Sequence, residues 1–241
     1  MLAKVLTVAL TGLDAHLIDV EVDIAGGLPQ FSVVGLPDAT VRESRDRVRS
    51  ALKNTGFHFP AKKITVNLAP ADIKKEGAGL DLAIAVGILV AEEVIAAEQL
   101  DHRVLVGELS LDGQIKPVSG ALSIALACRN HSLLLPAQNG PEAAMIDGVA
   151  VYGLHTLPEA VAFLRGECKL EPHDADRTKW FSPAPADDED YGDVRGQDHA
   201  KRALEIAAAG GHNVLMVGPA RLGQNHVGQT SADYSSSHGT R

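Results

Sequence analysis

Alternation between apolar and polar positions predicts strands near the start of the chain. Residues 5–10 and 18–24 show it, and the second run places Asp19, Glu21 and Asp23 on its polar face. A period of two is typical of a strand with one buried face. We therefore expect two strands, the second with an exposed, acidic side. Shorter apolar runs predict further strands at residues 31–34, 64–68, 133–135 and 149–152.

Helical periodicity predicts four helices in the same region. Asp38 suits an N-cap for a helix that continues to about Thr55 and is closed by Gly56. The other three helices are expected at residues 80–91, 120–129 and 157–164. The Asp-Gly pair at 112–113 lies between apolar runs at 104–109 and 114–118, which is typical of a hairpin turn. Together these elements predict a mixed α+β domain that ends near residue 166.

Periodicity stops between residues 167 and 190. This segment combines prolines with acidic residues, and such a composition buries too little apolar surface to offset the entropy of ordering. It is therefore predicted to be a linker, in which Trp180 and Phe181 anchor on a neighbouring surface. The tail at residues 220–241 ends in Ser, His, Gly and Thr without periodicity, so we expect it to be disordered.

The strongest candidate chemistry lies in the last thirty residues. Residues 213–217 form a short apolar run between glycines, typical of a buried parallel strand that leads into a phosphate loop. Such a loop has the form G-x-x-x-x-G-K-[ST], where Lys reaches the phosphates and the hydroxyl holds Mg²⁺. Gly218 and Gly223 have the required spacing, but Gln224 and Asn225 replace the Lys and Ser/Thr. The glycines of a phosphate loop are therefore present, but the cation that reaches the phosphates and the hydroxyl that holds Mg²⁺ are missing.

Composition excludes several classes of function. With 45% hydrophobic and 22% charged residues, the 241-residue chain is ordinary for a globular protein, and its formal charge of −9 leaves room only for a local basic face. Cys128, Cys168 and the ten histidines show no metal-ligand or disulfide spacing, so no metal site is expected. The apolar run at 82–91 is shorter than the ~20 residues that span a bilayer. No signal pattern opens the chain. We expect a cytoplasmic protein that makes no membrane contact.

One face of the helix predicted at residues 38–55 is basic. Its side chains, which recur at helical spacing, are Arg42, Arg45, Arg49 and Lys53. Such a face could contact DNA phosphates without reading sequence. The alternatives are a solvated face paired with Glu43 and Asp46, or a subunit contact. The lysine pairs at 62–63 and 74–75 could extend the patch, although lysine pairs on loops are usually solvated.

No catalytic residue is expected. Asp72, Glu76 and Asp81 could form an acid/base cluster, but none has a paired nucleophile, and Asp81 can cap its helix.

Three segments near the carboxy terminus carry a family resemblance. They are YGDVRGQ at 191–197, AKRALEI at 200–206 and GGHN at 210–213. They resemble the start of the AAA+ module in magnesium-chelatase-like ATPases of the YifB/ComM type. The resemblance implies contacts to ATP by Gly196 and Gln197 on the adenine side, and by Gly218, Pro219 and Gly223 at the phosphates. For Gln197 the alternative is an ordinary place at the start of a helix.

The departure from the family pattern has a simple genetic interpretation. The family continues with GPPGSGKTMLAKRLP, a full phosphate loop. One permitted set of codons for residues 220–235, read one nucleotide later, translates as PGSGKTMLAKRLPTI. We therefore hypothesise a one-nucleotide insertion near the codons for Pro219 and Ala220, with the residues after it out of frame. Resequencing that codon pair tests it, and an intact frame encoding Ala-Arg-Leu in several isolates would exclude it.

The first domain resembles the same family. The segments that carry this resemblance are 34–38 (VGLPD), 41–45 (VRESR), 64–72 (ITVNLAPAD), 74–77 (KKEG) and 106–113 (VGELSLDG). The family domain is similar to the proteolytic domain of Lon and the carboxy-terminal domain of RadA, on the ribosomal protein S-five domain-two-like topology. Lon cuts with a Ser-Lys dyad, whose positions fall near Gly79 and Leu122. Neither residue can act as nucleophile or base, so we do not expect a protease.

The resemblance implies four segments: 1–166 as the magnesium-chelatase-like domain, 167–190 as linker, 191–219 as the start of a truncated P-loop AAA+ module, and 220–241 as an out-of-frame tail. In the intact family, ATP and Mg²⁺ serve a hexameric ring that remodels DNA, like a branch-migration helicase in competence and recombination. This chain is expected to lack functional cofactors and ATPase activity, since the remaining ATPase motifs would lie beyond Arg241. The alternatives are a non-catalytic binding or oligomerisation module, or a chelatase-like or chaperone-like ring acting on protein.

Overall fold

The computed structural model describes residues 2–75, 77, 79–174 and 194–216. Contacts divide the chain into two compact units, with the boundary between residues 177 and 178. Most of the predicted linker, with Trp180 and Phe181, and the predicted tail lie outside the described residues. Within the described residues, no helix is both long and apolar enough to cross a membrane.

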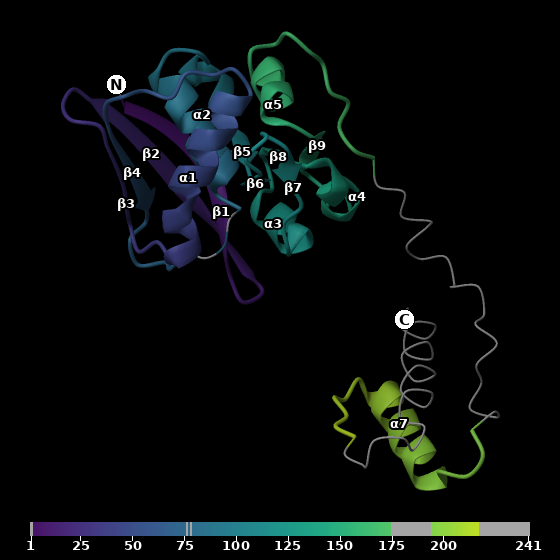
Figure 1. Ribbon diagram of the computed structural model, residues 1–241. Coiled ribbons are helices and arrows are strands. Elements are labelled where there is room, and N and C mark those ends of the chain that lie inside the picture. Colours follow the sequence, from purple (N-terminus) through teal and green to yellow (C-terminus); the bar gives the residue numbers. More distant parts are fainter. Residues whose placement is uncertain (1, 76, 78, 175–193, 217–241) are drawn as a thin grey trace. The chain divides into compact units, whose positions relative to one another are not determined.

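A seven-stranded sheet forms the centre of the first unit (Figure 1). Its strands are β1 (Leu2–Thr11), β2 (Asp14–Ala25), β3 (Gln30–Val34), β4 (Lys63–Ala69), β5 (Arg103–Leu105), β8 (Ser132–Pro136) and β9 (Ala150–Leu154). They lie in the order β3-β4-β2-β1-β5-β8-β9. The β1–β2 and β2–β4 pairs are antiparallel and the other neighbours are parallel, so the sheet is mixed and mostly parallel.

Helices cover the sheet unequally. The first core cluster packs α1 (Ala39–Asn54), α2 (Asp81–Ala91) and α5 (Leu157–Leu164) against one face. The second packs α3 (Ala121–Ala127) and α4 (Gly140–Ala143) against β1, β5, β8 and β9 on the other. Two short 3₁₀ helices, η1 (Ala97–Leu100) and η2 (Ala137–Asn139), complete the unit. Sequence periodicity missed η1, η2 and α4, because each is too short to show a repeat.

The predicted limits of α1 are confirmed. The side chain of Asp38 accepts a hydrogen bond from the backbone N–H of Val41 at 2.7 Å, which satisfies one free donor of the first turn. Thr55 is the C-cap, and Gly56 follows with φ +86°. Every residue of α2 is buried, as its apolar sequence predicts. At Gly87 a Cβ would lie 2.6 Å from Val22 Cγ2, so the glycine lets α2 approach β2 closely.

The predicted hairpin exists with shorter arms. β6 (Glu108–Leu109) pairs with β7 (Ile115–Lys116), and Gly113 has φ +84° in the turn. The expectation that the first arm begins at residue 104 was wrong. Val104 and Leu105 instead belong to β5, which pairs with β1 and β8. Their side chains are fully buried in the two core clusters on opposite faces of the sheet.

The polar face of β2 is largely uncovered, as its alternation predicts. Asp23 is exposed, and Asp19 and Glu21 are half-buried. Asn67 on β4 donates a hydrogen bond to Glu21 at 2.8 Å, and Lys4 on β1 lies 2.9 Å from Asp19. These cross-strand contacts hold the open face in register.

The second unit is described as α7 (Asp198–Gly210) with short flanking segments. Leu204 and Ala207 form its buried side, and Gly211 ends the helix with φ +62°. The predicted strand at 213–217 is wrong over residues 213–216, which adopt no strand and expose Leu215 by 87%. A parallel strand needs neighbours on both edges, and the described part of this unit supplies none. Val217 lies outside the described residues.

The two cysteines should react at very different rates. Cys128 is fully buried, and this burial raises the pKa of its thiol to about 12, whereas Cys168 is half-exposed. Since the thiolate is the reactive form, we expect a thiol reagent at about pH 8 to modify Cys168 in the native chain and Cys128 only after unfolding. Equal rates for both thiols in native protein would contradict the placement of Cys128.

Candidate nucleic-acid interface

The exposed side of α1 carries the basic residues that the sequence singled out. Arg42, Arg45, Arg49 and Lys53 are all exposed on one side of the helix. The opposite side is buried in the core through Val41, Ser44, Val48, Ala51 and Leu52. We call these four side chains the α1 basic face. The predicted division of the helix is confirmed, whereas contact with DNA stays a prediction.

The three arginines of this face make only weak contacts with the rest of the chain. Arg42 donates a 3.2 Å hydrogen bond to the carbonyl of Pro37, and Arg45 lies 3.9 Å from Asp46. The guanidinium of Arg49 lies over the ring of Phe59, 5.9 Å from its centroid. Exposed contacts of this kind contribute little and are screened by salt. The face therefore remains available to an external anion.

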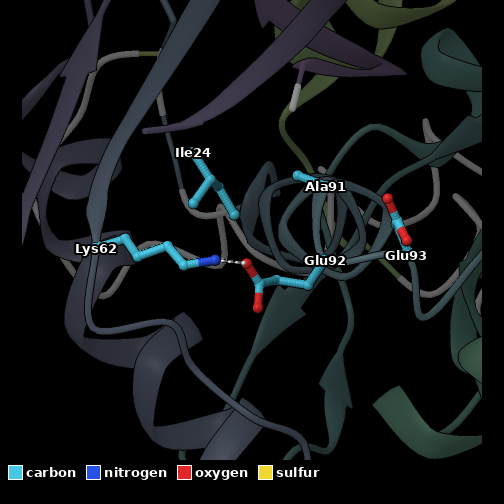
Figure 2. A pocket seen from close by; sticks show the side chains of 5 residues that line it. All are labelled: Ile24, Lys62, Ala91, Glu92 and Glu93. Carbon is cyan, nitrogen blue, oxygen red and sulfur yellow. Dashed lines mark hydrogen bonds and ion pairs between the residues drawn. The ribbon is translucent and has the colours of Figure 1, made fainter. Parts of the chain in front are cut away.

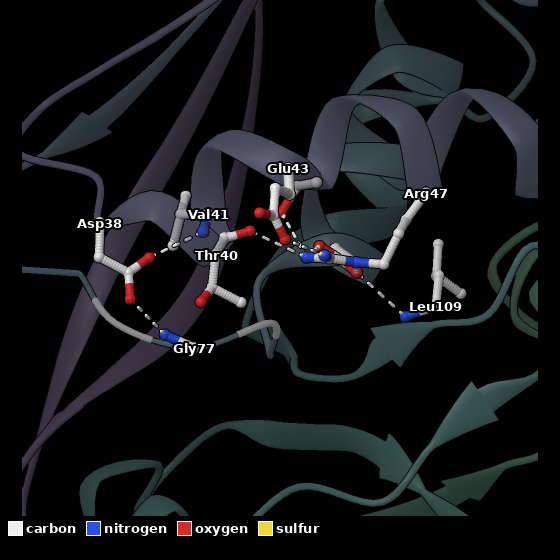
Figure 3. A network of polar contacts seen from close by, with 9 residues as sticks. Asp38, Thr40, Val41, Glu43, Arg47, Gly77 and Leu109 are labelled. Atoms are coloured by element: carbon white, nitrogen blue, oxygen red, sulfur yellow. Dashed lines mark hydrogen bonds and ion pairs between the residues drawn. The ribbon is translucent and has the colours of Figure 1, made fainter.

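The fifth basic residue of the helix, Arg47, points inward instead. Arg47 binds the carboxylate of Asp81 through two hydrogen bonds, Nε to Oδ2 at 2.6 Å and Nη2 to Oδ1 at 3.0 Å (Figure 3). Asp81 is fully buried and also accepts from the backbone N–H of Leu109 at 3.3 Å. The hydrogen bond to Asp81 raises the pKa of Arg47 above its usual value. This pair ties α1 to α2 and to β6, and so fixes the direction in which the basic face points.

The interpretation of Asp81 as a helix cap was wrong. Leu80 is the N-cap of α2 and makes no side-chain cap hydrogen bond, while Asp81 lies in the first turn with its carboxylate directed to Arg47. The described residues do not form the acid/base cluster that was considered for Asp72, Glu76 and Asp81. Asp72 is exposed, Asp81 is buried with Arg47, and Glu76 lies outside the description. The sequence did hold a signal for the Arg47–Asp81 pair, because Asp81 is the single charged residue of an otherwise apolar helix.

The first turn of α1 is fixed by a second contact. Asp38, already the N-cap, accepts a 3.3 Å hydrogen bond from the N–H of Gly77 (Figure 3). In the same loop Lys75 is fully buried and its ammonium donates to the carbonyl of Pro70. Burial lowers the pKa of this lysine. Lys75 therefore neither extends the basic face nor stays solvated, whereas Lys74 beside it is exposed.

The other lysine pair, at residues 62–63, lies outside α1. The ammonium of Lys62 lies 3.1 Å from Glu92 at the end of α2, beside a surface hollow of about 290 Å³ (Figure 2). His58 lies 3.7 Å from the same carboxylate. The hollow is also lined by Ile24, Ala91 and Glu93. Lys63 is exposed at the start of β4.

The positions that the resemblance assigns to ATP fall mostly outside the description. Gly218, Pro219, Gly223, Gln224 and Asn225 are not described. Gly196 and Gln197 are described, are both exposed, and have φ of +73° and +60°. Gln197 is the N-cap of α7, and its side chain makes no capping hydrogen bond. The alternative prediction, that Gln197 lies at the start of a helix, is therefore confirmed.

The positions near the Lon dyad form no dyad. Gly79 lines a cavity of about 240 Å³, and Leu122 is 45% exposed on α3. Ser119 also lines the cavity, but among the described lining residues there is no lysine or histidine to activate its hydroxyl. The same described part of the chain holds no group of three or more His, Cys, Asp or Glu side chains arranged to bind a metal.

The geometry of α1 suits a phosphate backbone. The helix carries five basic and two acidic side chains, net +3, in a chain of net −9. From Arg42 to Lys53 the rise along the helix is ~16 Å, a length that passes several phosphates of one DNA strand. Arginine guanidinium groups bind phosphate oxygens in a bidentate manner. The face could hold DNA by its backbone without reading its bases.

Comparison with known families covers both units. A model of the family described as subunit ChlI of Mg-chelatase matches residues 20–139, which include α1 and its basic face. A second, described as magnesium chelatase, subunit ChlI, matches residues 190–232, which include Gly196, Gln197 and the altered loop. Both matches indicate one class of protein, the magnesium-chelatase-like AAA+ proteins.

Curated relatives narrow the class. The uncharacterised protein YifB of Escherichia coli K12 is 45% identical over 231 residues, which cover 92% of this chain and 44% of YifB. Competence protein ComM of Haemophilus influenzae is 43% identical over 226 residues, covering 92% and 44%. An uncharacterised Mycobacterium tuberculosis protein is 40% identical, covering 95% and 45%. The chain belongs to the YifB/ComM type of magnesium-chelatase-like proteins. It spans a little under half the length of these relatives.

Proposed function

We propose that the intact protein is an ATP-dependent DNA-remodelling ATPase that works as a hexameric ring, like a branch-migration helicase in recombination and competence. In this proposal the α1 basic face contacts DNA phosphates, and ATP binds at the module that begins near Gly196 and Gln197. The observation that carries the proposal is the basic face itself, four exposed cations on one helix of an acidic chain. The likeness to Competence protein ComM supports it.

In this proposal the chain keeps the four segments predicted from its sequence. Residues 1–166 form the accessory domain, on the ribosomal protein S-five domain-two-like topology. Residues 167–190 are the linker, 191–219 begin the AAA+ module, and 220–241 are out of frame. The location is cytoplasmic. ATP and Mg²⁺ are the cofactors of the intact ring, and the residues to hold them lie in the restored loop.

The chain as it stands should not turn over ATP. Phosphoryl transfer develops charge on the γ-phosphoryl oxygens, which Lys and Mg²⁺ stabilise in phosphate-loop enzymes. Gln224 and Asn225 supply neither a cation nor the hydroxyl ligand of Mg²⁺. The module start would then serve binding or assembly alone.

Restoring the reading frame tests the proposed function. Deleting one nucleotide at the codons for Pro219 and Ala220 should give a full-length protein whose phosphate release is Mg²⁺-dependent and rises several-fold with DNA. The unrepaired chain is the matched control, and we expect no phosphate release from it. A repaired protein that no DNA form stimulates would end the DNA-motor proposal, and metal-dependent release by the unrepaired chain would refute its predicted inactivity.

A second candidate is a chelatase-like or chaperone-like ring that acts on protein. The cavity beside Gly79, a residue that the sequence resemblance sets near the nucleophile position of Lon, is the observation that favours it. Stimulation of the repaired ATPase by an unfolded polypeptide and not by DNA would select this candidate.

A further inference from the structure

One edge of the central sheet is open. β3 pairs with β4 on one side, and no described residue pairs with it on the other (Figure 1). The opposite edge is different, because the N–H of His173 donates to the carbonyl of Val151 in β9 at 2.7 Å. An uncovered strand edge is a template for another strand.

The backbone groups that face the open edge can be identified. The N–H of Gln30 donates to the carbonyl of Lys62 at 3.3 Å, on the β4 side. Successive residues of a strand direct their N–H and C=O groups to opposite sides, so those of Ser32 and Val34 also face β4. The N–H and C=O groups of Phe31 and Val33 therefore face outward.

The residues around this edge lack the usual protection. Natural edge strands are often guarded by lysine or by inward-pointing charges, and β3 has no charged residue from Gln30 to Val34. Exposed apolar side chains gather there instead. Leu28 is 89% exposed, Val34 46% and Leu36 57%.

We propose that β3 is a self-association surface, on which two copies of this chain pair antiparallel about a two-fold axis through Ser32. In this register Phe31 lies opposite Val33 of the second copy, and all of their outward N–H and C=O groups form reciprocal hydrogen bonds. Shifting the register by two residues would leave some of them without partners. Pairing of the two β3 strands joins the central sheets of the two copies into one continuous sheet.

Side-chain chemistry favours a second copy as the occupant. The Phe31–Val33 pair is aromatic with β-branched, a favourable cross-strand combination. Because β3 carries no charge, self-pairing sets no like charges opposite one another at the axis, even though each chain is net −9. The edge is short, so we expect a weak dimer, with a dissociation constant of roughly 1–100 µM.

Sedimentation velocity of the full chain is the first test. From about 1 µM to about 500 µM the sedimentation coefficient should rise as copies pair. Ser32→Lys should abolish the rise, because it places two lysines opposite each other at the axis. Thr65→Lys is the matched control, since Thr65 is the β4 partner of Ser32 on the same sheet face, one strand inward. It should leave the dimer intact.

Disulfide trapping tests the register itself. In a Cys168→Ser background, Ser32→Cys should cross-link readily, because non-hydrogen-bonded partners lie about 4.5 Å apart at Cα, within disulfide reach. Gln30→Cys should not, since the two residues 30 would lie about 13 Å apart along the strands. Equal cross-linking at both positions would overturn the register. A monomer at every concentration, or an assembly that Ser32→Lys leaves intact, would overturn self-pairing and favour a strand of another protein as the occupant.

Discussion

Arg47→Ala is expected to lower the free energy of unfolding by about 3–5 kcal/mol. Removing one partner of a buried ion pair leaves the other charge without compensation in the interior, which is strongly destabilising. Here the remaining group would be the carboxylate of Asp81, which has no exposure to solvent and would keep only the N–H of Leu109. Urea denaturation monitored by circular dichroism measures the change.

Arg45→Ala is the matched control for this variant. Arg45 lies two residues earlier on the same helix, is exposed, and contacts Asp46 at 3.9 Å. Its removal should change stability by no more than about 0.5 kcal/mol. Arg47→Lys should fall between the two, because an ammonium cannot reproduce the paired hydrogen bonds of the guanidinium. A loss below about 1 kcal/mol for Arg47→Ala would mean that Asp81 does not depend on Arg47.

Replacing Arg42, Arg45 and Arg49 together with alanine is expected to weaken DNA binding by roughly 100-fold at physiological salt. Each phosphate contact releases about 0.9 of a condensed counterion, so three lost contacts remove a large electrostatic contribution. Fluorescence anisotropy with a short labelled duplex measures the affinity. The loss should be similar for different sequences, since phosphate contacts carry no base information.

A variant of equal charge separates contact from net charge. Lys62, Lys63 and Lys116 are exposed and lie off α1. Replacing all three with alanine removes the same formal charge as the triple arginine variant. If the α1 basic face contacts the DNA phosphates, this control binds DNA nearly as well as the original chain. Equal losses of DNA affinity in the two variants would mean that the affinity depends only on the net charge of the chain.

The elements with strong local signals were predictable from the sequence. Alternation at residues 18–24 predicts β2 with its open acidic face, and the cap at Asp38 with Gly56 after the last turn limits α1. The spacing of Arg42, Arg45 and Arg49 is enough to place them on one face, because helical geometry alone decides it.

Features that depend on partners distant in the chain were not predictable in the same way. Asp81 has a local pattern that fits a helix cap, and only the packing of α1 on α2 brings it to Arg47, 34 positions earlier. Lys75 looks like an ordinary loop lysine, yet the fold buries it. The apolar run at 213–216 has the composition of a strand but no neighbour to pair with in the described part of its unit.

The most direct test of the central claim, that the α1 basic face holds DNA by its phosphates, is the salt dependence of DNA affinity. The logarithm of the binding constant should fall linearly with the logarithm of salt concentration, and the slope should shrink by about 3 in the Arg42, Arg45 and Arg49 triple-alanine variant. The Lys62, Lys63 and Lys116 variant should keep the original slope. An unchanged slope in the triple arginine variant would contradict the assignment of α1 as the DNA-contacting face.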